Sequence, residues 1–380
     1  MTWFDTYRQL KNCFELNSDE IDIPESNLVI RNFSFQSTLS DELNFSTEDR
    51  GISENFQFRY PVIMKKNRPR HEKAIILLHG LNERTWLKHL AGAKMLVEQT
   101  NRPVLLFPLS FHINRGLPDW IDLRKMARPL AERQSQYTGV KESSLVNLAL
   151  SKRLTDSPDR FLLSGLQSIN DLTALIKSIK SGKHPLFKEN ATTDIFAYSI
   201  SCMLLQALMI SNPNSILSGS RIVLFAGGSV FEQINGVSKY IMDTVAFATM
   251  RKYYLDLITT SKNFYLKGLR PMVMESNLGL AFRSLLTSDR MKNTRLKGIS
   301  AFYKDLLIIS LRNDRVMPVN GIVEATGEKF LKTGRFKVLH FPYEYSHENP
   351  FPVLNEKLEK QVEKAFYSVY DPALRFFRRD

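Results

Sequence analysis

The chain has 380 residues, and its hydrophobic and charged fractions, 43% and 24%, are those of an ordinary globular protein. This length is sufficient for one elaborated domain or for a core with a lid. The formal charge of +13 at pH 7 would attract nucleic acid, acidic lipid or an anionic substrate. The basic residues are dispersed, however, and the sequence has no nucleic-acid-binding motif with stacking aromatic residues. We therefore expect most of this charge to lie on solvated surface and do not expect nucleic acid as a partner.

Nothing in the sequence indicates a metal, a cofactor or a membrane span. The two cysteines, Cys13 and Cys202, are far apart, and no pair of Cys or His residues has the spacing of zinc ligands. The first residues lack the basic and apolar regions of a secretory signal, and no apolar run approaches the roughly 18 residues of a membrane span. The sequence therefore predicts a cytoplasmic protein without a metal or cofactor.

Residues 1–70 predict a short amphipathic helix followed by edge strands. Apolar side chains repeat every three or four positions over Trp3–Phe14. Asn27–Phe35 alternates between apolar and polar residues, and Phe56–Met64 resumes as a second strand. The polar stretch Ser37–Glu54 between them predicts a loop.

The strand Lys73–Leu78 begins the predicted core. It is continuously apolar after its first residue, as expected of a strand covered on both faces in a parallel sheet. A helix, Trp86–Gln99, and a second apolar strand, Pro103–Leu109, follow. This order requires a parallel pair with a right-handed crossover. Residues 111–164 then break the pattern and predict an insertion over the carboxyl edge of the sheet.

The remainder of the chain alternates strands and helices around one long interruption. The predicted strands are Ile195–Tyr198, Arg221–Gly228, Asp305–Leu311 and Phe336–Phe341. The predicted helices are Leu166–Ile179, Tyr240–Ile258, Leu278–Leu286, Gly321–Leu331 and Pro352–Tyr367. Residues 231–300 hold no clear strand and are too many for a connection, so they predict a helical lid between core segments 71–230 and 301–380.

The stretch Asp194–Met209 joins a predicted strand to a predicted helix at Ser199. So sharp a turn needs small residues two positions before and two positions after the hinge, and Ala197 and Ser201 stand there. This is the small-x-Ser-x-small form of a nucleophile elbow, which exposes the serine oxygen and directs the following N–H groups to the same space. The alternative is that Ser199 is an ordinary helix N-cap.

A serine hydroxyl becomes a useful nucleophile only beside a general base that an acid orients. Asp314 lies three residues beyond a predicted strand, and His347 lies between the last predicted strand and the last helix. Ligands of open parallel sheets bind at these carboxyl ends of strands. Ser199, Asp314 and His347 follow the order nucleophile, acid, histidine. The alternative for Asp314 is a turn-forming role beside Asn313.

Together these motifs resemble the α/β-hydrolase superfamily over about residues 62–367. The matching residues are His79-Gly80 after a strand, Ser199 with Ala197 and Ser201 in place of the usual glycines, Asp314 followed by Pro318, and His347 before Glu348-Asn349-Pro350. The resemblance implies an α/β-hydrolase fold, with a mostly parallel eight-stranded sheet flanked by helices, a helical lid and one further insertion.

The resemblance also implies a role for each motif. Ser199 would be the nucleophile, His347 the general base and then acid, and Asp314 the group that holds the imidazole tautomer. The backbone N–H groups of Leu81 and Ile200 would form the oxyanion hole. His79 of the His-Gly pair is more often structural in such a motif.

The predicted function is that of a serine hydrolase that cleaves an ester, thioester or amide of a small acyl substrate, and the alternative is a non-catalytic α/β-hydrolase-like binding protein with a basic surface. His112 and Arg115 follow a strand at the active edge, so they either line the substrate pocket or hydrogen-bond a loop. The basic residues of the insertion favour an acidic acyl or leaving group. No motif in the lid or loops identifies the substrate.

Overall fold

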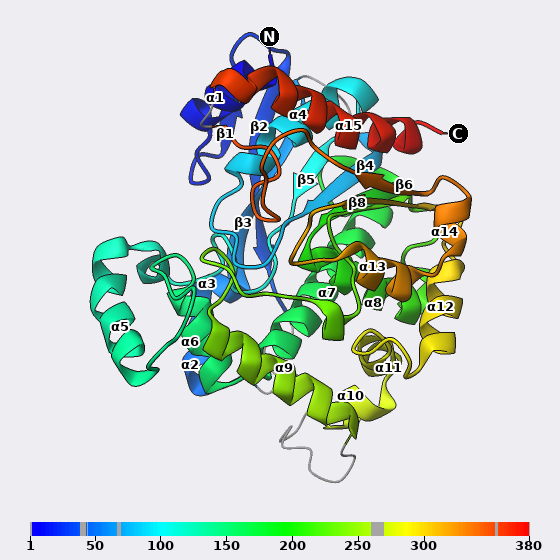
Figure 1. The fold of residues 1–380 in the computed structure, drawn as a ribbon. Coiled ribbons are helices and arrows are strands. Elements are labelled where there is room, and N and C mark those ends of the chain that lie inside the picture. The colour runs from blue at the N-terminus through cyan, green and yellow to red at the C-terminus, as the bar shows by residue number, and fades with distance from the viewer. Residues whose placement is uncertain are drawn as a thin grey trace.

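One sheet forms the centre of the computed structural model, which describes residues 2–38, 43, 45–66, 70–259, 270–353 and 356–379. Within these residues the sheet has nine strands in the order β1-β2-β3-β5-β4-β6-β7-β8-β9 (Figure 1). The strands are β1 Glu20–Asp22, β2 Leu28–Gln36, β3 Gln57–Lys65, β4 His71–Leu78, β5 Val104–Leu106, β6 Phe187–Tyr198, β7 Ile222–Phe225, β8 Leu306–Leu311 and β9 Phe336–Leu339. The pairs among β1, β2, β3 and β5 are antiparallel, and all pairs from β5 through β4 to β9 are parallel.

The predicted α/β class and the mostly parallel sheet are therefore confirmed, but the predicted number of eight strands is wrong. The additional strand, β1, has three residues and pairs only with β2 at the edge of the sheet, where Asp22 lies opposite Val29. So short a strand has too few residues for a period-two pattern to be recognised, and its formation depends on the partner strand. β6 also begins earlier than predicted. Near its start, Lys188–Asn190 are polar and exposed, so they lack the apolar pattern of a buried strand.

Helices cover both faces of the sheet. One face packs against α1, α4 and α15, which lie side by side at the top of Figure 1. The other face packs mainly against α7 and α8, with the helices from α9 to α13 beyond them. The helices on the first face are α1 Trp3–Cys13, α4 Leu87–Thr100 and α15 Glu359–Phe377. The others named here are α7 Arg160–Lys180, α8 Ile200–Ser211, α9 Thr244–Thr259, α10 Arg270–Glu275, α11 Asn277–Ser284, α12 Lys292–Ser300 and α13 Val319–Thr326.

Side chains of β4 show why its sequence is continuously apolar. Ile75 and Leu77 belong to the core under α1, α4 and α15, whereas Ala74, Ile76 and Leu78 belong to the core under α7 and α8. Because alternate side chains of a strand point to opposite faces, a central strand with both faces covered needs apolar residues at every position.

The sequence predicts the bounds of α1 well and those of α15 less well. α1 matches the prediction closely because a capping box fixes its start, in which Thr2 Oγ1 accepts from Asp5 N at 3.1 Å and Thr2 N donates to Asp5 Oδ2 at 3.0 Å. α15 begins later and extends ten residues beyond the predicted end at Tyr367, through Pro372 to Phe377. Its apolar face continues past the proline, since Leu374, Phe376 and Phe377 are all buried.

Helices and turns, with no strand of the sheet among the described residues, make up residues 111–164 and 231–300. The first segment contains a 3₁₀ turn, η1 Pro118–Ile121, then α5 Leu123–Gln136 and α6 Leu148–Asp156, and α5 projects to one side (Figure 1). The second contains α9 to α12, and α6 packs against α9. Residues 260–269 lie outside the described part of the chain. The lid role of residues 231–300 and the division of the chain into four segments remain predictions. Among the described helices, none combines the length and the apolar character required to span a membrane.

The short helical elements complete the connections. They are α2 Thr47–Arg50, α3 Ser53–Phe56, α14 Lys329–Lys332, η2 Pro213–Ser215, η3 Phe231–Gln233 and η4 Glu356–Leu358.

Candidate active site

Ser199 occupies a strained turn between β6 and α8. Its φ of 61° and ψ of −124° lie outside the regions that a non-glycine residue ordinarily adopts. Two backbone hydrogen bonds hold this conformation, from Ser199 N to Phe225 O at 3.0 Å and from Cys202 N to Ser199 O at 3.0 Å. Ser199 makes no side-chain N-cap hydrogen bond. The backbone therefore has the strained strand-to-helix geometry expected of the predicted elbow, and Ser199 is not an ordinary N-cap serine.

Small residues surround this turn because neighbouring chain segments approach it closely. A Cβ atom added to Gly227 would lie 2.1 Å from Ser199 O, and one added to Gly80 would lie 3.1 Å from Ser199 Cβ. Ala197 is fully buried, and the Ser201 hydroxyl donates to Tyr198 O at 2.8 Å. Glycine, alanine and serine thus provide the room that the turn requires.

The structure brings the three predicted catalytic side chains together. Ser199 Oγ lies 2.6 Å from His347 Nε2, and His347 Nδ1 lies 2.7 Å from Asp314 Oδ2. Ser199, Asp314 and His347 are each no more than 6% exposed. They come from the carboxyl ends of β6 and β8 and from the loop between β9 and α15, so the edge of the sheet positions all three.

The second carboxylate oxygen of Asp314 is fixed by its own loop. Asp314 Oδ1 accepts hydrogen bonds from Val316 N at 2.9 Å and from Met317 N at 2.8 Å. Asp314 therefore both forms the turn and contacts the histidine. The two backbone donors point Oδ2 at His347 and leave the carboxylate little freedom to rotate.

Tyr198 supports His347 from beneath, which the sequence did not reveal. Its ring stacks on the imidazole with the ring centroids 5.8 Å apart and the planes inclined by 15°, and its hydroxyl donates to the His347 carbonyl oxygen. Burial and the nearby Glu83 and Asp314 carboxylates raise the pKa of Tyr198 well above its usual value, so the phenol stays a donor. In sequence this residue is indistinguishable from an ordinary core residue of a strand.

Glu83 is a second residue that sequence reasoning missed. Its carboxylate accepts from Gly80 N at 2.9 Å and lies 2.7 Å from His89 Nε2 and 2.8 Å from Lys88 Nζ. Burial opposes ionisation of Glu83, but His89 and Lys88 outweigh it and hold its pKa well below the usual range. The carboxylate anchors the loop that contains Leu81.

The N–H groups of Leu81 and Ile200 are available as donors beside Ser199. Within the described residues neither donates a hydrogen bond, whereas the N–H of Gly80 is used by Glu83. Ile200 is the first residue of α8, where backbone N–H groups lack helical partners and the helix dipole is positive.

His79 supports the loop that contains Gly80 and Leu81, because its Nδ1 donates to Gly80 O at 2.8 Å and its Nε2 accepts from Leu109 N at 2.9 Å. Burial, reinforced by His112, lowers the pKa of His79 to about 3, so it is a neutral, structural group.

His112 and Arg115 have different surroundings. Arg115 is completely buried and donates to Asn55 O, Pro108 O and Asp171 Oδ2, the last at 2.7 Å, so it holds the loop and lines none of the pockets described below. His112 Nδ1 donates to Ser110 O at 2.7 Å, while its buried Nε2 has no hydrogen-bond partner among the residues that the structure describes. Burial lowers the pKa of His112 to about 4, and the residue lines two pockets.

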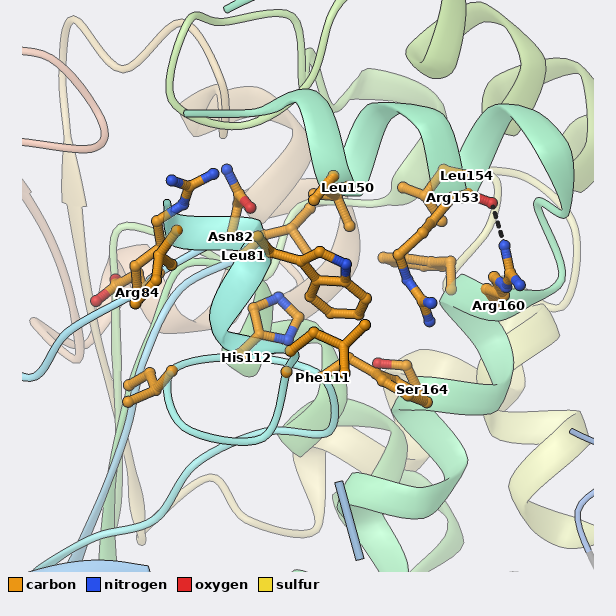
Figure 2. Close-up of a pocket in the computed structure, with 18 residues that line it drawn as sticks. Leu81, Asn82, Arg84, Phe111, His112, Leu150, Arg153, Leu154, Arg160 and Ser164 are labelled. Carbon is orange, nitrogen blue, oxygen red and sulfur yellow. Dashed lines mark hydrogen bonds between the residues drawn. The ribbon is translucent and has the colours of Figure 1, made fainter. Parts of the chain in front are cut away.

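Three pockets meet at Leu81. The first, of about 830 Å³ and open to solvent, contains Ser199 and His347. The second, of about 620 Å³, is apolar and lies between α7 and α8 next to Ile200. The third, of about 690 Å³, lies between α6 and the η1 turn and is shown in Figure 2. In the part of the chain that the structure describes, no group of three His, Cys, Asp or Glu residues is placed to hold a metal ion.

Comparisons with known proteins find similar folds at low sequence identity. Carboxyl esterase 2 from the fungus Tuber melanosporum is 8% identical with a TM-score of 0.47, and the match covers 97% of this chain and 95% of that one. An esterase from Pyrobaculum calidifontis is 12% identical with a TM-score of 0.45, covering 98% and 91%. The esterase LipW from Mycobacterium marinum is 10% identical with a TM-score of 0.45, covering 92% and 83%. No curated protein matches the sequence.

A family model, by contrast, matches almost the whole chain. It is described as a family of unknown function, DUF6051, and it matches residues 1–378. Because the match runs from the N-terminal helix to the end of α15, it includes every element that carries the site. The chain belongs to the family of unknown function DUF6051.

Proposed function

We propose that the protein is a serine hydrolase that cleaves an ester, thioester or amide of a small acyl substrate through an acyl-enzyme, with carboxylic esters the foremost class. The observation that carries the proposal is the unbroken hydrogen-bonded line from Ser199 Oγ through His347 to Asp314, which starts at a strained elbow. A serine, a histidine and a carboxylate in this geometry are the parts that nucleophilic acyl transfer needs.

The proposed reaction has two halves. In the first, Ser199 Oγ attacks the carbonyl carbon while His347 Nε2 takes the hydroxyl proton, and the imidazolium then gives this proton to the leaving group as the bond to it breaks. In the second, His347 takes a proton from water, the resulting hydroxide attacks the acyl-enzyme, and the proton returns to Ser199. Asp314 stays ionised throughout and keeps the Nδ1 proton of His347 in place.

The negative charge of each tetrahedral intermediate would be held by the N–H groups of Leu81 and Ile200. Both are free of other hydrogen bonds in the described structure, and Glu83 anchors the loop of the first. Donors that are already oriented cost no reorganisation at the moment of reaction, and losing one such donor typically slows catalysis by about 10²–10³.

The position of His347 also orients the substrate. The leaving group must lie within reach of His347 Nε2 to be protonated, so it occupies the open pocket that contains this residue. The acyl half then extends to the other side of the carbonyl carbon, past Leu81, toward the two pockets that His347 does not line.

Active-site labelling tests the proposal. A fluorophosphonate probe should label the wild-type protein, and Ser199→Ala should abolish labelling while thermal unfolding shows that the variant is folded. A panel of short to long acyl esters on the purified protein would then give the preferred chain length. A well-folded wild type that neither reacts with the probe nor cleaves any ester of the panel would instead favour the non-catalytic binding protein.

A further inference from the structure

Three arginines line the pocket between α6 and η1. Figure 2 shows Arg153 extending from α6 into this pocket, with Arg160 beyond it and Arg84 on the opposite side. Leu117 and Ile121 line the pocket from the η1 side, and Ile121 is 51% exposed. The pocket therefore has a cationic wall, and exposed residues of the insertion contribute to its lining.

The positive charge of this wall exceeds the negative charge that faces it. Arg153 Nη1 and Arg160 Nε each lie 2.8 Å from a different oxygen of Asp49, so one buried carboxylate serves two buried guanidinium groups. Arg160 also contacts Glu48, whose side chain is 72% exposed and therefore screened by solvent. Arg84 donates to the backbone oxygens of residues 145 and 146. Glu83 also lines the pocket, but its carboxylate is already paired with Lys88 Nζ at 2.8 Å and lies 2.7 Å from His89 Nε2.

Arg153 is held in one orientation with donors to spare. Its guanidinium lies 4.6 Å from the ring centroids of both Phe111 and Trp120. The only hydrogen bond that it donates within the described residues goes to Asp49. A guanidinium has five N–H donors in a planar fork that matches a carboxylate, so Nε and Nη2 remain for a ligand.

The pocket shares part of its lining with the candidate active site. Leu81, Asn82, Glu83 and Arg84 line both this pocket and the pocket that contains Ser199. Since His347 lines only the latter of the two, a group in the arginine-lined pocket belongs to the acyl half of the substrate and not to the leaving group.

From this arrangement we propose that the arginine-lined pocket binds a carboxylate at the far end of the acyl group, so that the preferred substrates are half-esters of dicarboxylic acids. The proposal rests on the proposed hydrolase function for the position of the scissile bond, but binding of the carboxylate itself does not depend on catalysis. The apolar pocket beside Ile200 accepts no such charge, because apolar side chains dominate its lining.

The test compares matched pairs of substrates. The p-nitrophenyl monoesters of adipic, pimelic and suberic acid are compared with the same esters in which a carboxamide replaces the free carboxylate, at constant ionic strength. The ratio of kcat/KM for carboxylate over carboxamide should exceed about tenfold for at least one chain length, since hydrogen bonds to charged groups contribute more than neutral ones.

Two kinds of variant should reduce this ratio. Arg153→Gln removes the charge and most of the fork, and Ile121→Asp places a carboxylate on the pocket lining without disturbing a buried contact. The matched control is Leu123→Asp, because Leu123 is 54% exposed and lies only two residues after Ile121, at the start of α5, but does not line the pocket. The ratio should fall about tenfold in the first two variants and stay unchanged in the control. If Arg153→Gln does not fold, the comparison of Ile121→Asp with Leu123→Asp tests the proposal by itself.

The remaining outcomes distinguish failure of the carboxylate-binding proposal from failure of the proposed hydrolase function. The proposal of carboxylate binding would be wrong if the wild type cleaved both members of each pair equally. It would also be wrong if Arg153→Gln and Ile121→Asp left the ratio of kcat/KM unchanged. Neither result would contradict the proposed hydrolase function. If no ester is cleaved, thermal unfolding is measured with millimolar adipate and adipamide. Stabilisation of the wild type by adipate alone, lost in Arg153→Gln, would still support the pocket, and its absence would overturn it.

Discussion

At the scale of single residues, the candidate site depends on hydrogen bonds that fix side-chain direction. Asp314 accepts from its own loop on one oxygen and from His347 on the other, so the imidazole has one orientation and one tautomer. A strained Ser199 and a stacked Tyr198 complete this arrangement. The strained backbone of Ser199 lowers the free energy of unfolding, and the surrounding contacts hold the residue in this conformation, as is common at functional sites.

Asp314→Asn should therefore impair catalysis while preserving the fold. The amide can donate to Nδ1 and so stabilise the wrong tautomer of His347, and kcat should fall by about 10³–10⁴-fold with little change in KM. Steady-state kinetics on a cleaved ester, together with thermal unfolding, measures both effects. Asp305→Asn is the matched control, because Asp305 is exposed at the other end of β8. Equal kcat values for the two variants would contradict the role assigned to Asp314.

At the scale of elements, one buried carboxylate joins the insertion to the helical segment that follows β7. Asp243 is paired with Arg133 of α5, and Arg133 Nη2 lies 2.8 Å from Asp243 Oδ1. Asp243 N donates to Ser151 Oγ of α6 at 3.0 Å, and Asp243 Oδ1 accepts from Ala246 N in the first turn of α9 at 2.9 Å. Three helices thus converge on a residue that is fully buried.

Arg133→Ala should destabilise this assembly strongly. Removing one partner of a buried ion pair leaves the other charge uncompensated, which costs about 3–5 kcal/mol. Urea unfolding measures the loss, and hydrogen exchange should show the amides of α5, α6 and the start of α9 becoming less protected. Arg128→Ala on the same helix is the control, since that side chain is 90% exposed and its pair with Glu132 is screened. A similar free energy of unfolding for both variants would show that the buried Asp243 carboxylate does not need Arg133 to compensate its charge.

At the scale of the whole molecule, buried histidines make stability depend on pH. Burial lowers the pKa of His79 to about 3 and those of His112 and His184 to about 4, from an ordinary value of 6.5. Above pH 6.5 neither the folded nor the unfolded chain protonates these groups, so stability is complete. Below pH 6.5 the unfolded chain takes up protons that the folded chain does not, and stability falls until the folded pKa values are reached.

We therefore expect the free energy of unfolding to decrease between pH 7 and pH 5, by about 2 kcal/mol for each buried histidine. Urea unfolding at several pH values measures this slope. His112→Gln should remove about one third of it, whereas His340→Gln, at an exposed position, should leave it unchanged. A free energy of unfolding that is constant over this range would mean that these histidines are protonated in the folded protein.

The sequence by itself determined most of the long elements and the order of the candidate residues, because both are local properties. A short continuous apolar run, as in Lys73–Leu78, favours a strand buried on both faces, and an Ala-x-Ser-x-Ser turn between a strand and a helix indicates Ser199 as an elbow residue, with an ordinary N-cap as the alternative. Asp314 and His347 are predictable because each lies in the loop that follows a strand, and strand ends of a parallel sheet meet at one edge.

Only the tertiary structure decided which side chains support that site and what surrounds it. The pair between Asp49 and Arg153 spans 104 positions of the chain, and the contact of Tyr198 with His347 spans 149. The short strand β1 forms only because β2 lies beside it. No local pattern encodes such contacts, since their energy depends on burial and on partners that the folded chain alone brings together.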